Sequence, residues 1–119
     1  IPQSDNMILY IDTTNSLKTI IEINDMRFVQ NYSSPREQNT LLFIDRVLKD
    51  NNVNLNDITS IKVNPGPGSF TGTRVGVTIA NTLAQSLNIP INGKKTPINV
   101  NYENPPNITK PKTARVVIK

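Results

Sequence analysis

Three short runs rich in apolar residues, separated by polar turns, lie between residues 7 and 32: the first is continuously apolar until it ends in polar residues, and the second alternates in part. A period of two is typical of strands that bury one face of a sheet. Because the turns between the runs are short, we expect neighbouring strands to pair antiparallel. The pattern predicts a three-stranded meander over residues 7–12, 17–23 and 26–32.

A helical period follows Pro35, which suits the first turn of a helix because the N–H that proline lacks would be unpaired there. Leu42 lies outside the apolar arc of this segment. The residues that share the arc, which spans about 160° at roughly 100° per residue, are Leu41, Phe43, Ile44, Val47 and Leu48. The pattern predicts a helix over residues 36–50 whose apolar face packs on the sheet.

A polar link at residues 51–57 precedes the remaining predicted elements. They are a fourth strand over 58–64, a Gly- and Pro-rich loop, a second helix that ends near Asn88, and a fifth strand over 89–93. This order resembles the ribonuclease-H-like unit of the actin, sugar-kinase and Hsp70 superfamily (ASKHA). The sequence therefore predicts an α/β fold, a single lobe of that type over residues 7–93.

Residues 94–119 differ from this lobe in composition. They hold 6 basic residues and 1 acidic residue, against 7 basic and 8 acidic in residues 1–93, so the net charge of +4 arises from the C-terminal segment. We expect residues 94–112 to be largely irregular. Residues 113–118 regain strand character, and they form either a terminal strand on a sheet edge or a frayed end.

The chain contains no cysteine and no histidine, which removes thiolate nucleophiles, disulfides and the usual zinc ligands. Acid–base chemistry would then fall to carboxylates or lysines. No apolar run is long enough to span a membrane. These features predict a cytoplasmic protein that binds no metal, needs no cofactor and does not contact a membrane.

The strongest local signal is the run Asn-Pro-Gly-Pro-Gly-Ser-Phe-Thr-Gly at residues 64–72, between a strand and a helix. It is neither a P-loop nor a dinucleotide fingerprint. Its amides at a helix N-terminus suit a phosphate or carboxylate. Two prolines and three glycines also serve simply to form a tight turn, which the residues alone favour. The candidate anion- or nucleotide-facing residues are Gly66, Gly68, Ser69, Thr71 and Gly72.

Asp12 and Thr13, at the end of the first predicted strand, complete this candidate site. Superfamily ATPases place a magnesium-organising acid and a phosphate-facing hairpin at such a position. Residues 13–16 contain no glycine, however, and glycine lets a backbone approach phosphates closely. A single Asp at a strand end is more often a turn or cap residue, and that alternative stays open.

The second predicted helix has an apolar arc of about 200°, wider than packing on one sheet requires. Arg74 is the only charged residue between Lys62 and Lys94. We therefore predict that part of this surface packs on a partner helix, although the first helix of the same chain is an equal alternative. The predicted interface residues are Leu42, Gly72, Val75, Gly76, Ile79, Ala80, Leu83 and Ala84.

Four segments carry a family resemblance. They are Ile-Leu-Tyr-Ile-Asp-Thr at residues 8–13, Pro-Arg-Glu at 35–37, Pro-Gly-Pro-Gly-Ser-Phe-Thr-Gly-Thr-Arg-Val-Gly at 65–76 and Leu-Asn-Ile-Pro at 87–90. Together they resemble the bacterial TsaB (YeaZ) family, over about residues 7–93 and in the right order. The Gly-Pro-Gly-Ser-Phe-Thr-Gly run is highly specific to that family.

The resemblance implies a non-catalytic paralogue of the threonylcarbamoyl transferase TsaD. Such a protein is needed with TsaD and the ATPase TsaE to make threonylcarbamoyladenosine beside the anticodon of tRNAs that read ANN codons. The resemblance also implies that the two helices of the lobe pair with those of TsaD, or of a second copy, in a four-helix bundle. Contact with tRNA would then be weak or indirect.

The chain departs from the family pattern in two places. Gln38 stands where family members often have His after Pro-Arg-Glu. No match follows Gly93, so the usual second lobe is missing, and the chain is either a truncated piece or a one-lobed member. Because the superfamily nucleotide cleft lies between two lobes, we do not expect tight ATP binding by this chain alone.

Two other classes of function stay open. An ATP-dependent superfamily enzyme or a metallopeptidase-like hydrolase would use Asp12 and the loop at residues 65–72, but the absence of His and of metal-ligand spacing argues against either. A nucleic-acid binder would use the cations of residues 94–119. Only Tyr102 offers an aromatic ring for base stacking there, which weakens that reading.

Overall fold

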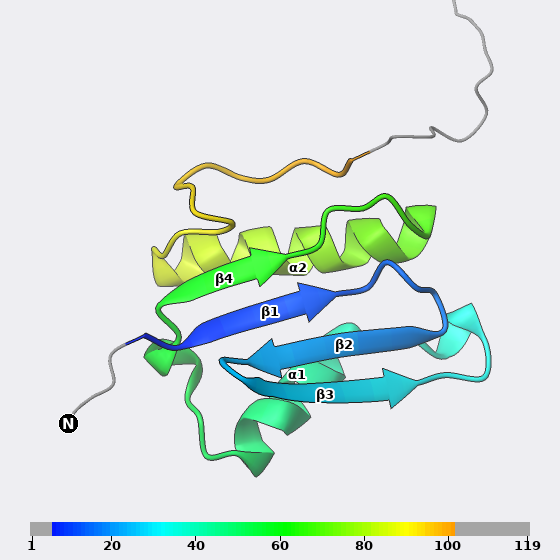
Figure 1. The fold of residues 1–119 in the computed structure, drawn as a ribbon, viewed down its shortest axis with the longest axis horizontal. Coiled ribbons are helices and arrows are strands. Elements are labelled where there is room, and N and C mark those ends of the chain that lie inside the picture. The colour runs from blue at the N-terminus through cyan, green and yellow to red at the C-terminus, as the bar shows by residue number, and fades with distance from the viewer. Residues whose placement is uncertain (1–5, 102–119) are drawn as a thin grey trace, which may run out of the picture.

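The computed structural model describes residues 6–101, and its elements follow the predicted order as far as the second helix (Figure 1). The strands are β1 (Ile8–Asp12), β2 (Lys18–Ile23), β3 (Met26–Asn31) and β4 (Ser60–Val63). The helices are α1 (Thr40–Asp50) and α2 (Phe70–Leu87), with short 3-10 turns η1 (Pro35–Glu37) and η2 (Leu55–Asp57). The predicted α/β fold class is confirmed: three antiparallel strands are followed by a helix, a strand and a helix.

The four strands form one mixed sheet in the order β3-β2-β1-β4. β2 pairs antiparallel with β1 and β3, whereas β4 pairs parallel with β1. The turn from β2 to β3 has Asn24 at φ 52, a left-handed conformation that asparagine adopts more readily than most residues. Ile11 lies opposite Ile21 on one side and Val63 on the other, so apolar side chains of three strands share one face.

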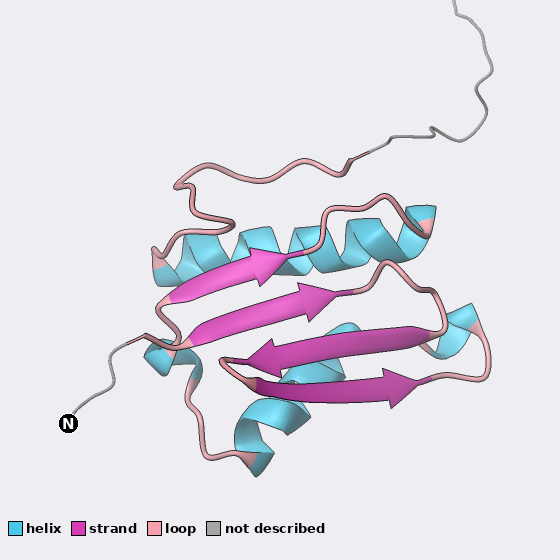
Figure 2. Ribbon diagram, in the orientation of Figure 1, coloured by secondary structure: helices cyan, strands magenta, loops and turns pink. Residues whose placement is uncertain are grey.

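Both helices cover this face of the sheet, α1 behind β2 and β3 and α2 behind β4 in the view of Figures 1 and 2. Between the sheet and the helices lies the core, in which Leu9, Ile11, Ile21, Ile61 and Ala80 have no exposed surface. In the described part of the chain, no helix covers the opposite face. The same residues contain no helix long and apolar enough to cross a membrane.

Helix α1 begins at Thr40, four residues later than predicted. The Asn39 side chain accepts a hydrogen bond from the Leu42 N–H at 3.2 Å and so caps the helix. Residues 35–37 form the separate turn η1 instead. The prediction was also wrong for Leu41, which is 59% exposed: the buried residues of the same turn are Thr40 and Phe43, so Leu41 lies on the other side of the helix.

The predicted fifth strand is reduced to a single bridge between Ile91 and Ile61. Asn92, at φ 50, turns the chain away from the sheet. Its side-chain amide accepts from the Val63 N–H at 2.8 Å and donates to the Val63 carbonyl at 3.1 Å. One asparagine side chain therefore replaces the peptide group that a fifth strand would have supplied at the edge of β4.

Residues 94–101 run back along α2 and pack on the lobe, although they contain no helix or strand (Figure 1). The Asn81 side chain accepts from the Ile98 N–H at 2.8 Å and donates to the Ile98 carbonyl at 2.9 Å. The Asn101 N–H donates to the Pro65 carbonyl at 2.6 Å, and Ile98 and Val100 pack against the core. The predicted terminal strand at residues 113–118 lies outside the described residues.

Candidate functional site

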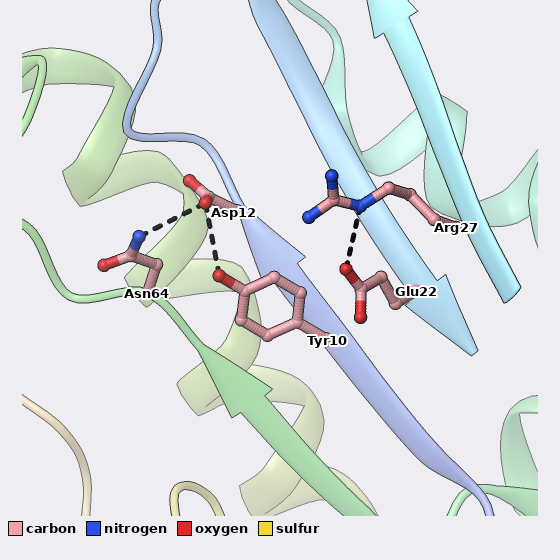
Figure 3. A network of polar contacts seen from close by, with 5 residues as sticks. All are labelled: Tyr10, Asp12, Glu22, Arg27 and Asn64. Atoms are coloured by element: carbon pink, nitrogen blue, oxygen red, sulfur yellow. Dashed lines mark hydrogen bonds and ion pairs between the residues drawn. The ribbon is translucent and has the colours of Figure 1, made fainter. Parts of the chain in front are cut away.

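The Asp12 carboxylate lies at the carboxyl end of β1 and accepts four hydrogen bonds, of which Figure 3 shows those from Tyr10 and Asn64. Thr14 donates to Oδ1 through its N–H at 2.9 Å and its hydroxyl at 2.7 Å. The Tyr10 hydroxyl and the Asn64 amide donate to Oδ2, both at 3.2 Å. Asn64 in turn accepts from the Gly66 N–H at 3.1 Å, so Asp12 joins the loop after β1 to the loop after β4.

The titration of this cluster follows from these contacts. Partial burial is the largest influence on Asp12 and pushes its pKa up, but the hydrogen bonds from Thr14, Asn64 and Tyr10 outweigh it, and the pKa lies below its usual value. Burial and the neighbouring Asp12 carboxylate raise the pKa of Tyr10 to about 12. Asp12 is therefore charged and Tyr10 is a neutral donor near pH 7. The lowered pKa makes the Asp12 carboxylate a weaker base than an ordinary aspartate.

Three glycines allow α2 and its preceding loop to approach the turn after β1. A Cβ added to Gly68 would lie 2.5 Å from Thr14 Cβ, and one added to Gly72 would lie 2.6 Å from the Thr13 carbonyl oxygen. A Cβ on Gly76 would meet Thr13 Oγ1. Thr13 itself is fully buried, and its hydroxyl donates to the Gly72 carbonyl at 2.5 Å. The glycines of the motif thus make room for a tight contact between α2 and β1.

Backbone amides of the motif bond within the chain. The Ser69 N–H donates to the Thr14 carbonyl at 2.7 Å, and the Gly72 N–H donates to Ser69 Oγ at 3.2 Å, which makes Ser69 the N-cap of α2. Thr71, another of the candidate anion-facing residues, is exposed and lines a shallow hollow on α2 instead. Among the described residues, no three His, Cys, Asp or Glu side chains gather as a metal site requires.

The candidate anion-facing residues therefore divide between two places. Asp12, Thr13 and the loop residues up to Gly72 meet at the carboxyl edge of the sheet, and Thr71 lies apart from them. The polar groups that meet there bond chiefly to one another. Whether the edge faces an anion stays a prediction.

The predicted partner interface is corrected in part by the burial of α2. Gly72, Gly76, Ala80 and Ala84 are buried against the chain's own sheet and cannot meet a partner helix. The reason is that small residues permit close approach to β1 and β4 as well as to another helix. Leu42 is exposed, but it lines a polar hollow beside β3, with Gln30, Tyr32 and Arg46 among its neighbours, and not the side of α1 nearer α2.

The remaining predicted interface residues adjoin an exposed strip of α2. Ile79 and Leu83 are half-buried and Val75 is 39% exposed. Beside them, Phe70 is 41% exposed, with the Arg74 guanidinium 5.1 Å from its ring centroid. We call this strip the outer face of α2, and its residues are Phe70, Thr71, Arg74, Val75, Thr78 and Ile79.

Sequence reasoning missed several residues of these two surfaces. Tyr10 and Asp12 are two apart on a strand and so share a face, a signal that was present in the sequence. Phe70 and Arg74 are four apart on a helix, which also indicates contact. The contact of Asn64 with Asp12 depends on the register of β4 against β1, and no local pattern reveals it.

Comparison with known proteins adds a family to this geometry. A family model described as "TsaD: tRNA N6-adenosine threonylcarbamoyltransferase" matches residues 32–97, more than half of the chain. The tRNA threonylcarbamoyladenosine biosynthesis protein TsaB of Bacillus subtilis is 38% identical over 88 residues, which are 71% of this chain and 38% of that protein. TsaB of Escherichia coli is 35% identical over 92 residues, which are 75% of this chain and 40% of that protein.

Solved structures agree on the fold. The structure "YeaZ from Pseudomonas aeruginosa" superposes with a TM-score of 0.62 at 24% identity, over 73% of this chain and 42% of that one. A second structure, of an uncharacterized Pseudomonas aeruginosa protein described as similar to peptidase YEAZ, gives a TM-score of 0.61 with the same coverage. The chain thus spans about two fifths of the length of the proteins it matches.

Proposed function

The chain belongs to the TsaB family, and the TsaD family model matches it as well. We therefore propose that it acts in the biosynthesis of threonylcarbamoyladenosine on tRNA, as a non-catalytic partner protein. Its partners in this role are a TsaD-type transferase and a TsaE-type ATPase. The relatives carry the name of the pathway, and the lobe of this chain corresponds to part of their length. The chemistry would then reside on the transferase, and this chain would hold the transferase in its working form.

The observation that carries the proposal is the outer face of α2. An exposed phenylalanine, an exposed valine and a half-buried isoleucine lie together there, around one arginine. Aromatic and aliphatic side chains with an arginine at their centre are typical of the residues that dominate protein interfaces. The face therefore suits docking of another protein, and it carries three predicted interface residues at or beside it: Val75, Ile79 and Leu83.

The Asp12 cluster supports a non-catalytic role. Both carboxylate oxygens accept hydrogen bonds from the chain, and the low pKa of Asp12 makes it a weak base. In the alternative function, an ATP-dependent enzyme or hydrolase, this carboxylate would organise a cation or accept a proton. Its hydrogen-bond partners support a structural role, in which Asp12 joins the loop after β1 to the loop after β4.

A reconstitution experiment tests the proposal. The chain is added to the TsaD-type and TsaE-type proteins of its source organism, and threonylcarbamoyladenosine in tRNA is measured by mass spectrometry. We expect modification to require the chain and to be lost with Val75→Asp, which places a charge on the outer face of α2. Asp12→Asn is expected to retain modification once its folding is verified by circular dichroism.

Two outcomes would contradict the proposal. If modification proceeds equally well without the chain, the chain is not a partner in this reaction. If Asp12→Asn forms the complex with the transferase but abolishes modification, Asp12 takes part in the chemistry, and the enzyme alternative gains the support that it lacks at present.

A further inference from the structure

Asn92 and Gly93 form a tight turn directly after the bridge that joins Ile91 to β4. The Lys94 N–H donates to the Ile91 carbonyl at 2.9 Å, and the Ile91 N–H donates to the Lys94 carbonyl at 2.8 Å. Both turn residues have positive φ, 50 for Asn92 and 78 for Gly93, as a type I′ turn requires. Asn-Gly is typical of such turns, and in this chain the pair occurs here and nowhere else.

The same pair of residues is chemically labile. The backbone nitrogen that follows an asparagine can attack the side-chain Cγ, so that a new bond joins this nitrogen to Cγ. The bond from Cγ to Nδ2 breaks, and ammonia leaves with the proton of the attacking nitrogen. Water then opens the resulting succinimide ring to aspartate, or to isoaspartate, in which the main chain runs through the side chain. Glycine favours the attack, because it has no Cβ beside its nitrogen.

The fold leaves Gly93 open to this reaction but restrains Asn92. Apart from its chain neighbours, no atom lies within 4 Å of a Cβ built on Gly93, and its N–H makes no hydrogen bond to a described residue. The Asn92 amide accepts from the Val63 N–H at 2.8 Å and donates to the Val63 carbonyl at 3.1 Å. An attack on Cγ needs the amide to turn toward the Gly93 nitrogen, so both bonds to Val63 must break first.

We propose that Asn92 is a site of spontaneous deamidation, which the folded edge of β4 suppresses and which, once it has occurred, loosens the attachment of residues 94–101 to the lobe. The reaction needs water and no partner protein, so it is independent of the proposed function. An open edge exposes the labile pair, and the chemical step then makes the opening irreversible.

The products explain why the attachment is lost. Aspartate at position 92 places an acceptor oxygen where Nδ2 donated to the Val63 carbonyl, so two acceptors face each other. Isoaspartate adds an atom to the main chain of the turn and so displaces the hydrogen bonds between Ile91 and Lys94. The turn leads into the segment whose Asn101 N–H donates to the Pro65 carbonyl, so the effect extends to the loop before α2.

The experiment incubates the full chain at pH 7 and in mild alkali, both folded and in urea. Peptide mass spectrometry then measures the conversion of each asparagine amide to an acid. Internal controls are the asparagines that also have positive φ but precede a residue with a side chain: Asn24, Asn52 and Asn88.

Two core variants separate opening of the edge from unfolding of the whole chain. Ile91→Ala weakens the bridge to β4 and leaves Asn-Gly intact, whereas Val47→Ala removes a similarly buried side chain from α1. Thermal melts verify that both variants are folded. A third variant, Asn92→Asp, has the aspartate product from the start, and hydrogen exchange measures its effect on the Ile98 and Asn101 amides.

We expect Asn92 to react faster than the three controls in urea, and at least about tenfold more slowly in the folded chain, because local opening limits the reaction. Ile91→Ala should accelerate the reaction in the folded chain more than Val47→Ala does. Asn92→Asp should speed exchange at Ile98 and Asn101, with the amides of β1 and β2 unchanged.

Three results would overturn the proposal, each at a different step. If Asn92 reacts no faster than the controls in urea, the pair is not labile. Equal rates in the folded chain and in urea, or equal acceleration by the two core variants, would show that the edge of β4 does not control the reaction. Unchanged exchange in Asn92→Asp at both amides would show that deamidation does not loosen residues 94–101.

Discussion

Asp12 stabilises the fold only when its carboxyl group is ionised. Hydrogen bonds lower the pKa of Asp12 in the folded chain, so folding favours the ionised form. The stabilisation is therefore complete above the pKa that Asp12 has in the unfolded chain. It is lost as the pH falls through the lower pKa that Asp12 has in the folded chain. Near pH 7 the carboxylate therefore contributes fully, and in acid it does not.

Asp12→Asn is expected to lower the free energy of unfolding at pH 7 by about 1–2 kcal/mol, because an amide offers one acceptor where the carboxylate offers two and leaves a donor unpaired. Urea unfolding at pH 7 and near pH 3 measures the difference. The gap between the two proteins should shrink in acid, as Asp12 becomes protonated. Asp45→Asn, at an exposed ion pair with Lys49, is the control and should change little. A gap that stays constant with pH would contradict the assignment.

Gly76→Ala is expected to destabilise the chain by about 1–2 kcal/mol, although alanine favours helices over glycine. The new methyl group would meet Thr13 Oγ1, whose hydroxyl is bonded to the Gly72 carbonyl and cannot move without breaking that bond. Chemical denaturation measures the effect. Adding Thr13→Ala should give a double variant more stable than the sum of the single effects predicts, since the clash is then relieved. A Gly76→Ala variant more stable than the wild type would refute this contact.

At the scale of elements, the burial of the small residues Gly72, Gly76, Ala80 and Ala84 of α2 leads to a prediction for Ala80. Ala80→Trp is expected to lower the melting temperature strongly, because Ala80 has no exposed surface and the added ring overfills the core between α2 and the sheet. Val75→Trp, on the outer face, should leave the melting temperature nearly unchanged. Thermal melts of the two variants compare one residue type at a buried and an exposed position of the same helix. Equal melting temperatures would place Ala80 on the surface together with Val75.

Asn81→Ala is expected to release residues 94–101 from α2, because the Asn81 amide makes both hydrogen bonds to the Ile98 backbone. Hydrogen exchange should show faster exchange of the Ile98 amide, with the amides of β1 and β2 unchanged. Asn99→Ala, at an exposed position in the same segment, is the control. Unchanged exchange at Ile98 would show that Ile98 and Val100 hold the segment through packing alone.

The elements that were predictable are those that depend on local pattern. Short apolar runs bounded by polar turns identified β1, β2 and β3, and the apolar period identified α1 and α2 to within a few residues. The start of α1 was misplaced, because the Asn39 side chain caps the helix, whereas Ser34, before Pro35, makes no side-chain cap hydrogen bond. The sequence predicted a fifth strand where the structure has a single bridge to β4. The difference was not predictable, because it depends on hydrogen bonds between Asn92 and Val63, which are 29 residues apart in the sequence.

At the scale of the whole molecule, the excess of basic residues lies in the last part of the sequence. Residues 102–119 contain 4 basic residues and 1 acidic residue, whereas residues 94–101 pack on the lobe through Ile98 and Val100. Removal of residues 102–119 is expected to abolish any salt-sensitive binding to tRNA and to leave the melting temperature unchanged. Removal of residues 94–119 should lower the melting temperature as well. Salt-sensitive binding that survives the shorter deletion would place the cationic contact on the lobe.

The residues of the candidate site could be predicted from the sequence, but the contacts between them could not. The motif at residues 64–72 and Asp12 stand out in the sequence, and they meet at one edge because β1 and β4 are parallel. That Asp12 bonds to Asn64, and that Gly72 packs on Thr13, depends on the tertiary structure. For the same reason, the small residues of α2 were predicted to contact a partner helix, whereas they pack on the sheet of the same chain.

Glycine and asparagine are needed for different structural reasons in this chain, and the reason at each position determines which substitutions that position tolerates. In the described residues, every non-glycine residue with positive φ is an asparagine, whereas Gly68, Gly72 and Gly76 have ordinary φ values and neighbours too close for a Cβ. Exchange of Asn52 or Asn88 for glycine would preserve the backbone turn. No side chain can replace the three glycines while β1 and α2 stay in contact. Sequence drift among relatives should thus be limited at residues 68, 72 and 76 by available volume, and at the turns by backbone conformation alone.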